Sequence, residues 1–187
     1  MISFASRLVV PKVRIYRVPP GRPGTLVTAR MVADLIREGA KDFYVRQKAI
    51  QIFRERKVPA KDRFGEVRAL FEWVQKNIRY TRDTMHVELL HSARRMIELK
   101  AGDCDDMTIL LGAMLMATGH RVRLVLAGFR PQKPHSYSHI YPEVNVNGHW
   151  IAIDATMPLR IGWAPPALWK KVCEVGKGET TCSSMTP

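Results

Sequence analysis

The sequence predicts an α+β domain in which helices come first and an antiparallel sheet follows. Apolar residues recur at helical spacing between residues 28 and 119. Residues 121–154 are instead rich in valine, leucine and isoleucine and contain an Asn-Gly turn. The chain has 187 residues, of which 46% are hydrophobic and 25% charged. Helices followed by strands, at this length and composition, favour one α+β domain with a small appendage.

Five helices are expected before residue 120. Thr28 is placed to cap the first, and Gly39 is placed to end it. The second helix spans about residues 42–57, the fourth about 87–99, and the fifth begins near Asp103. The third helix has the clearest buried stripe, because its apolar residues repeat at intervals of three and four. That stripe consists of Val67, Leu70, Phe71, Val74 and Ile78.

Three strands are expected after the helices. The first covers residues 121–129, and the other two form a hairpin that pairs residues 138–146 with 149–154. The two residues between them are Asn and Gly, which is typical of tight hairpin turns. Beyond Pro158 the sequence has no clear period, so we expect an irregular segment whose last residues, 176–187, are weakly ordered.

Composition divides the chain into four expected parts. Residues 1–27 form a basic arm, 28–60 a helical region, 61–165 the core, and 166–187 a C-terminal tail. The formal net charge is +13, and no acidic residue precedes Asp34. Six basic residues lie in the first 30 positions, namely Arg7, Lys12, Arg14, Arg17, Arg22 and Arg30.

Such an arm either docks on an acidic protein surface or a nucleic-acid backbone, or is a solvated, partly extended segment. Aromatic residues are scarce in it, which argues against stacking on bases.

The three cysteines point to a reducing compartment, the cytoplasm. An odd number at wide spacing does not suggest a disulfide framework, and no Cys-x-x-Cys pair suggests a zinc site. Cys173 and Cys182 lie in a polar end and are expected to be incidental. No apolar stretch is long enough to span a membrane, and no secretory leader is evident, so no membrane partner is expected.

Cys104 stands apart because it lies at the expected start of the fifth helix, within the sequence Gly-Asp-Cys-Asp-Asp of residues 102–106. The positive end of a helix dipole favours a thiolate, which is the nucleophile of covalent catalysis. Three neighbouring carboxylates oppose the thiolate, so a cation such as an imidazolium would have to offset them. The alternative is a small buried cysteine with no chemical role.

The hairpin places a histidine and a carboxylate together. With a two-residue turn, His139 lies opposite Thr156 and Tyr141 opposite Asp154, all on one sheet face. His139 and Asp154 are then diagonal neighbours, about 7–8 Å apart at the backbone, within reach of a hydrogen bond. Pro142 lacks an amide hydrogen, so we expect the strand pairing to be disturbed beside this pair.

These segments together resemble the transglutaminase-like cysteine enzyme superfamily over about residues 62–157. The resemblance rests on Phe-Glu-Trp-Val at 71–74, Ile-Arg-Tyr at 78–80, residues 102–106, His-Ile-Tyr at 139–141 and Trp-Ile-Ala-Ile-Asp-Ala-Thr at 150–156. It implies a papain-like core in which the cysteine helix packs on an antiparallel sheet.

The resemblance also implies roles for three residues. Cys104 would be the nucleophile, His139 the general base and acid, and Asp154 the group that orients the histidine. The amide of Cys104 would be one oxyanion donor. We therefore expect Cys104 Sγ within about 4 Å of a His139 ring nitrogen.

The reaction implied is acyl transfer from a peptide or glutamine amide of a protein or peptide substrate, either to water or to an amine, with hydrolysis favoured. No cofactor is expected, and no metal, since one Cys, one His and one Asp are too few for a closed zinc site. The remaining histidines, including His91 and His120, are expected at the surface or hydrogen-bonded.

The alternative is a non-enzymatic structural or assembly protein that reuses the fold. The short chain and basic arm resemble small stand-alone members encoded by bacteriophages. This resemblance extends the alternative to a virion location and to a homo-oligomer or larger particle.

Overall fold

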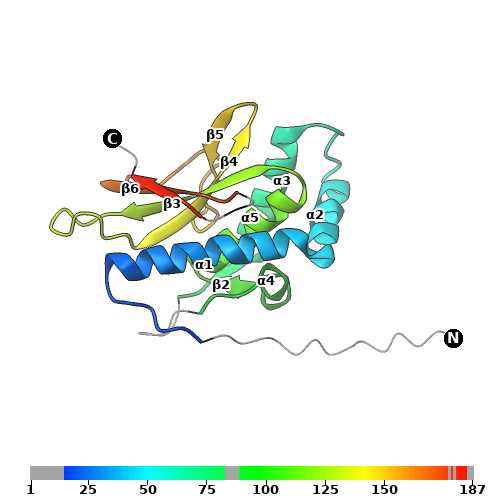
Figure 1. Cartoon of the computed structure of the whole chain (residues 1–187). Coiled ribbons are helices and arrows are strands. Elements are labelled where there is room, and N and C mark those ends of the chain that lie inside the picture. The colour runs from blue at the N-terminus through cyan, green and yellow to red at the C-terminus, as the bar shows by residue number, and fades with distance from the viewer. Residues whose placement is uncertain (1–14, 83–88, 177, 179, 185–187) are drawn as a thin grey trace.

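A computed structural model describes residues 15–82, 89–176, 178 and 180–184. Its helices lie against one face of a five-stranded antiparallel sheet, which confirms the α+β prediction (Figure 1). The elements in chain order are α1 (Arg22–Lys41), α2 (Phe43–Glu55), α3 (Arg63–Asn77), β1 (Arg79–Tyr80), α4 (Ala93–Leu99), β2 (Ala101–Gly102), α5 (Cys104–Ala117), β3 (Arg121–Gly128), β4 (His139–Val146), β5 (His149–Ala152), β6 (Trp169–Glu174) and β7 (Cys182–Ser184).

Helix α5 is the centre of the molecule. It packs against each of the other four helices and against β3 and β4, and lies between α1 and the sheet (Figure 1). Every residue from Asp105 to Leu115 is buried, as expected of a helix that is apolar on nearly all sides. The side chain of Asp103 caps the helix by accepting hydrogen bonds from the amides of Asp105 and Asp106. The expected start near Asp103 is therefore confirmed.

The large sheet has the strand order β5-β4-β3-β6-β7. One of its faces joins the helices in the main core, through residues such as Leu124, Ile140 and Val144. The opposite face carries a smaller apolar cluster that includes Val125 and Tyr141, against which the loop alanines 164 and 167 pack. Both faces are thus covered, which explains the nearly continuous apolar sequence of β3.

Two helix starts differ from the prediction. Helix α1 begins at Arg22 and not after Thr28, since Pro23 in the first turn has a backbone angle preset for a helix. Residues 22–27 of the expected arm are therefore helical, while residues 1–14 lie outside the described residues. Helix α4 begins at Ala93, with Ser92 as its cap, so residues 89–92 of the expected span precede the helix. Residues 87 and 88 are not among the described residues.

The expectation of an irregular C-terminal tail is wrong. Strand β6 pairs with β3, and β7 extends the sheet beyond it. A disulfide joins Cys173 of β6 to Cys182 of β7, and Cys173 is fully buried. These cysteines are structural, so the cysteine pattern no longer supports a reducing compartment.

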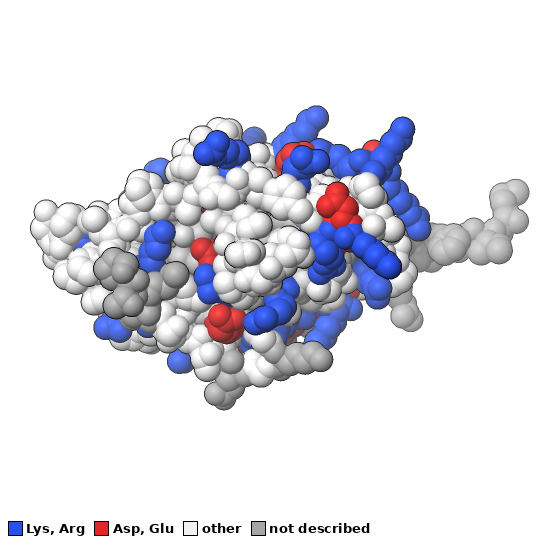
Figure 2. All heavy atoms as spheres, turned by 90° about the horizontal axis from the view of Figure 1, so that it is seen from above, with Lys and Arg blue, Asp and Glu red and all other residues white. Residues whose placement is uncertain are grey.

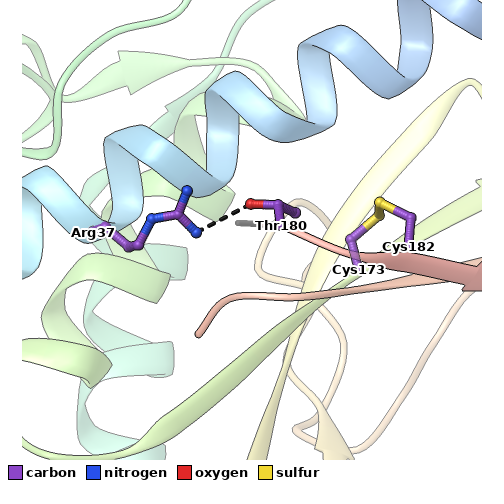
Figure 3. The surroundings of a disulfide bond; sticks show 4 residues. All are labelled: Arg37, Cys173, Thr180 and Cys182. Carbon is purple, nitrogen blue, oxygen red and sulfur yellow. Dashed lines mark hydrogen bonds between the residues drawn. A yellow bond between two sulfur atoms is a disulfide. The ribbon is translucent and has the colours of Figure 1, made fainter. Parts of the chain in front are cut away.

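The segment between β6 and β7 is also tied to the helices. Arg37 of α1 donates a hydrogen bond of 3.0 Å to the hydroxyl of Thr180, close to the disulfide (Figure 3). Within the described residues, no helix is both long and apolar enough to cross a membrane.

A buried polar cluster joins the start of α3 to the end of α5. His120, whose side chain is fully buried, donates from Nε2 to Glu66 at 2.8 Å. Arg63 donates to Glu66 at 2.9 Å and to the carbonyl of Gly119 at 2.8 Å. Burial of His120, with Arg63 nearby, lowers its pKa despite the opposing effect of Glu66. The prediction that His120 is hydrogen-bonded is confirmed.

Candidate active site

The hairpin brings His139 and Asp154 into contact. Strands β4 and β5 pair in the predicted register, with Val146 opposite His149 and Glu143 opposite Ala152. It continues to Ile153, whose amide donates to the carbonyl of Pro142 at 3.0 Å. His139 Nε2 donates to Asp154 Oδ2 at 2.7 Å, as the diagonal arrangement predicted. This bond leaves Nδ1 as the ring nitrogen able to accept a proton.

Pro142 explains why β5 ends where it does. Its carbonyl accepts from the β5 side, so its missing amide hydrogen would also have pointed to that side. The regular strand ends at Ala152, one residue before the partner of Pro142. The chain then turns, and both the amide and the hydroxyl of Thr156 donate to Asp154 Oδ1, at 3.1 and 2.7 Å. The expected disturbance beside the pair is confirmed, and it forms the turn that holds the carboxylate.

Asp154 is an anion held in the interior, with 3% of its surface exposed. Burial acts to raise its pKa, but the hydrogen bonds from His139 and Thr156 outweigh burial and leave the pKa below its usual value. The carboxylate therefore stays ionised at neutral pH and fixes one orientation and one tautomer of the imidazole.

Cys104 is the first residue of α5, and it is the cysteine that lies outside the disulfide of Cys173 and Cys182. It is partly exposed, and its Sγ lies 3.9 Å from Asp105 Oδ1. One turn further along the same helix face, the hydroxyl of Thr108 donates to the carbonyl of Ile140, next to His139. The first turns of α5 thus lie along the start of β4. The separation of about 4 Å between Cys104 Sγ and His139 stays a prediction.

Tyr80 lies beside the cysteine and was not singled out by the sequence argument. The short parallel pair of β1 and β2 sets Tyr80 opposite Gly102, two residues before Cys104. Burial raises the pKa of Tyr80, and the charges of Cys104 and Asp103 raise it further. Its hydroxyl therefore remains protonated beside the thiol. The Ile-Arg-Tyr sequence indicated the position, but periodicity gave no reason to place it near Cys104.

Asp106 anchors the segment before α4 to the cysteine helix. This fully buried carboxylate accepts from the amide of His91 at 2.8 Å and bonds its Nδ1 at 2.9 Å. Gly102 packs against it closely enough that a Cβ there would lie 2.6 Å from Asp106 Oδ2. His91 is hydrogen-bonded, as predicted. Its two bonds to Asp106 join the segment before α4 to the helix that carries Cys104.

No group of three or more His, Cys, Asp or Glu side chains that could hold a metal ion occurs in the described part of the chain. The groups described above are a thiol, an imidazole–carboxylate pair and a tyrosine hydroxyl. Tyr80 lines an open cavity of about 420 Å³, and Met107 and Thr156 are among the other lining residues.

Comparison with known proteins agrees with this description. The sequence model of the Transglutaminase-like superfamily matches residues 46–155, more than half of the chain. A search of curated proteins finds no match.

Three solved structures are reported for their similarity to this chain. A protease candidate from Parabacteroides distasonis ATCC 8503 has a TM-score of 0.58 at 11% identity, over 87% of this chain and 31% of that one. Rad4–Rad23 crosslinked to an undamaged DNA has a TM-score of 0.55 at 14% identity, over 86% and 45%. A cysteine protease candidate from Cytophaga hutchinsonii has a TM-score of 0.47 at 20% identity, over 76% and 52%. This chain thus spans between about a third and a half of each of these solved chains.

Proposed function

The chain belongs to the transglutaminase-like superfamily, and from that membership we propose that it is a thiol-dependent acyl-transfer enzyme acting on amide bonds of proteins or peptides. The observation that carries the proposal is the buried, ionised Asp154 bonded to His139 at 2.7 Å. An imidazole held in this way has one nitrogen available for proton transfer, which is what a cysteine nucleophile requires.

The proposed reaction has two steps. His139 Nδ1 takes the proton of Cys104 Sγ, the sulfur attacks the substrate carbonyl carbon, and the C–N bond breaks as the leaving amine receives that proton. An acyl thioester remains. His139 then takes a proton from water, the hydroxide adds to the thioester, and the C–S bond breaks to return the thiol. Asp154 stays ionised throughout and stabilises the imidazolium.

We propose two groups as hydrogen-bond donors to the oxyanion. The Cys104 amide lies at the start of α5, where backbone amides point away from the helix. The protonated hydroxyl of Tyr80 is the second donor we propose, because β1 holds it beside residues 102–104. An amine acceptor in place of water would give transamidation, and of these two reactions we favour hydrolysis.

A second candidate is a binding or assembly protein that reuses this fold without catalysis. The likeness in fold to Rad4–Rad23 crosslinked to DNA, together with the net charge of +13, favours it. Lys and Arg outnumber Asp and Glu on the face shown in Figure 2. In this reading the basic residues, including those of segment 1–27, dock on nucleic acid or on an acidic protein surface, and a role within a phage particle belongs here.

The test is covalent labelling of the folded protein. A glutamine-containing peptide that bears a thiol-directed chloromethyl ketone should form an adduct on Cys104 between about pH 6 and 9, located by peptide mass mapping. Cys104→Ala should abolish it. Absence of the adduct with folded protein throughout that range would favour the binding protein over the enzyme.

A further inference from the structure

The cavity lined by Tyr80, Met107 and Thr156 has a defined position in the fold. It opens between the end of α3, strand β1 and residues 155–158. Three of its lining residues lie near the proposed triad. Tyr80 is paired with Gly102, two residues before Cys104, and Met107 lies one turn after Cys104. The hydroxyl of Thr156 donates a hydrogen bond to Asp154. A substrate held in the cavity therefore contacts residues that flank the proposed triad.

One wall of the cavity is held in place by hydrogen bonds. Gln75 of α3 donates from Nε2 to the carbonyl of Leu159 at 3.0 Å and also to that of Met157. The loop after Asp154 is thus joined to α3 at residues that line the cavity. The opening is built from fixed elements on both sides, as expected of a substrate site.

The cavity is positively charged. Lys76 and Arg79 line it, both exposed, and none of the described lining residues is acidic. Glu72, one turn before Lys76 on α3, pairs instead with Arg56 of the segment that follows α2. Neither Lys76 nor Arg79 has an ion-pair partner within the described residues. Two cations without a counter-charge beside a reaction site favour an anionic ligand group.

We propose that this cavity is a substrate subsite that binds a carboxylate of the peptide, through Lys76 and Arg79, close to the amide that Cys104 attacks. The inference rests on the proposed function and narrows its substrate class to peptides that carry a carboxylate near the attacked amide. The carboxylate comes from a Glu or Asp side chain or from the peptide's own C-terminus. Cations exposed to solvent interact modestly, so the expected preference for the carboxylate is about fivefold for the pair and weakens as salt increases.

The test separates binding from chemistry. Fluorescent peptides are titrated against the full chain carrying Cys104→Ala, which prevents turnover. The first peptide has Glu near a central Gln and an amidated C-terminus. The second has Gln in place of that Glu and the same amidated C-terminus. The third has the sequence of the second but a free C-terminal carboxylate. Tighter binding of the first peptide identifies a side-chain carboxylate, and tighter binding of the third identifies the C-terminus.

The lining residues are then tested with a matched control. Lys76→Gln combined with Arg79→Gln should remove the preference for the carboxylate, whereas Arg68→Gln, an exposed cation two turns earlier on α3, should keep it. Equal binding of all three peptides, or a preference that survives the double substitution, overturns the subsite. Failure of the proposed function is a distinguishable result: the wild-type chain would show no labelling of Cys104, while the preference for the carboxylate peptide would persist.

Discussion

Substitution of Asp154 by Asn tests whether the Asp154 carboxylate orients His139, because Asn keeps the shape of the side chain and removes its charge. Asp154 accepts three hydrogen bonds, one from His139 Nε2 and two from Thr156. Asn retains an oxygen for the two bonds from Thr156 but presents an NH₂ group to His139. The imidazole must then carry its proton on Nδ1, the nitrogen that should receive the proton of Cys104.

The substitution should affect reactivity far more than folding. Losing one charge-assisted hydrogen bond costs about 1.5–3 kcal/mol of unfolding free energy. A wrong tautomer in a triad of this kind lowers the rate by about 10⁴-fold, equivalent to about 5.5 kcal/mol. The folded fraction should therefore remain high while acyl transfer is nearly lost.

The assay needs no knowledge of the substrate. Iodoacetamide alkylation of the folded chain reports on Cys104 alone, because the other two cysteines form the disulfide. The wild-type rate should rise at a pH well below about 8.5, the value of an ordinary thiol, and the Asp154→Asn profile should move towards that value. Thr156→Val, which removes one hydrogen bond but not the charge, is the matched control and should leave the profile nearly unchanged. Identical profiles for wild type and Asp154→Asn would refute the orienting role of the carboxylate.

Substitutions at four other residues have defined outcomes. Cys104→Ala should leave thermal unfolding nearly unchanged while abolishing acyl transfer. Cys104→Ser should be almost as inactive, since a hydroxyl is much harder to deprotonate than a thiol. Appreciable turnover by either variant would contradict the role of Cys104 as the nucleophile. Cys182→Ala should lower the unfolding free energy in urea by about 2–3 kcal/mol, because the disulfide closes a short loop, and an unchanged midpoint would show that the bond does not constrain the chain. The lowered pKa of His120 means that the folded chain binds fewer protons at this residue than the unfolded chain, so the free energy of unfolding should fall as the pH drops below about 6.5. His120→Asn should flatten that part of the pH profile in urea titrations. An unaltered slope would refute the role of His120 in this pH dependence. Gly102→Ala should destabilise the fold by about 1–3 kcal/mol, because its Cβ would overlap Asp106, and a normal melting temperature would show that the contact relaxes freely.

The half of the candidate site that lies on the hairpin could be predicted because a single turn determines it. Asn147 and Gly148 both have positive φ angles, 52° and 88°, which suit a two-residue turn. Once that turn is fixed, every pairing along β4 and β5 follows, including the diagonal approach of His139 to Asp154. The start of α5 was equally predictable, since Asp103 is a strong helix cap.

Contacts between segments distant in sequence were not predictable in the same way. Strand β6 contains Lys170 and Lys171, and its lysines obscure the alternation that marks a strand. The pairing of Cys173 with Cys182 depends on β6 and β7 being neighbours, which spacing alone does not reveal. The place of Tyr80 beside Cys104 likewise depends on the parallel pair of β1 and β2, which is too short to leave a pattern.

The strand order has a consequence for synthesis of the protein. Strand β3 lies between β4, which follows it directly, and β6, which follows only after the whole hairpin and a long connection. A nascent chain can therefore complete the hairpin with His139 and Asp154 while the other edge of β3, an apolar strand, still exposes its amides and carbonyls. Open edges of this kind recruit strands from other chains. Slow translation between residues 155 and 168 should thus favour aggregation, whereas rapid delivery of β6 should protect the sheet.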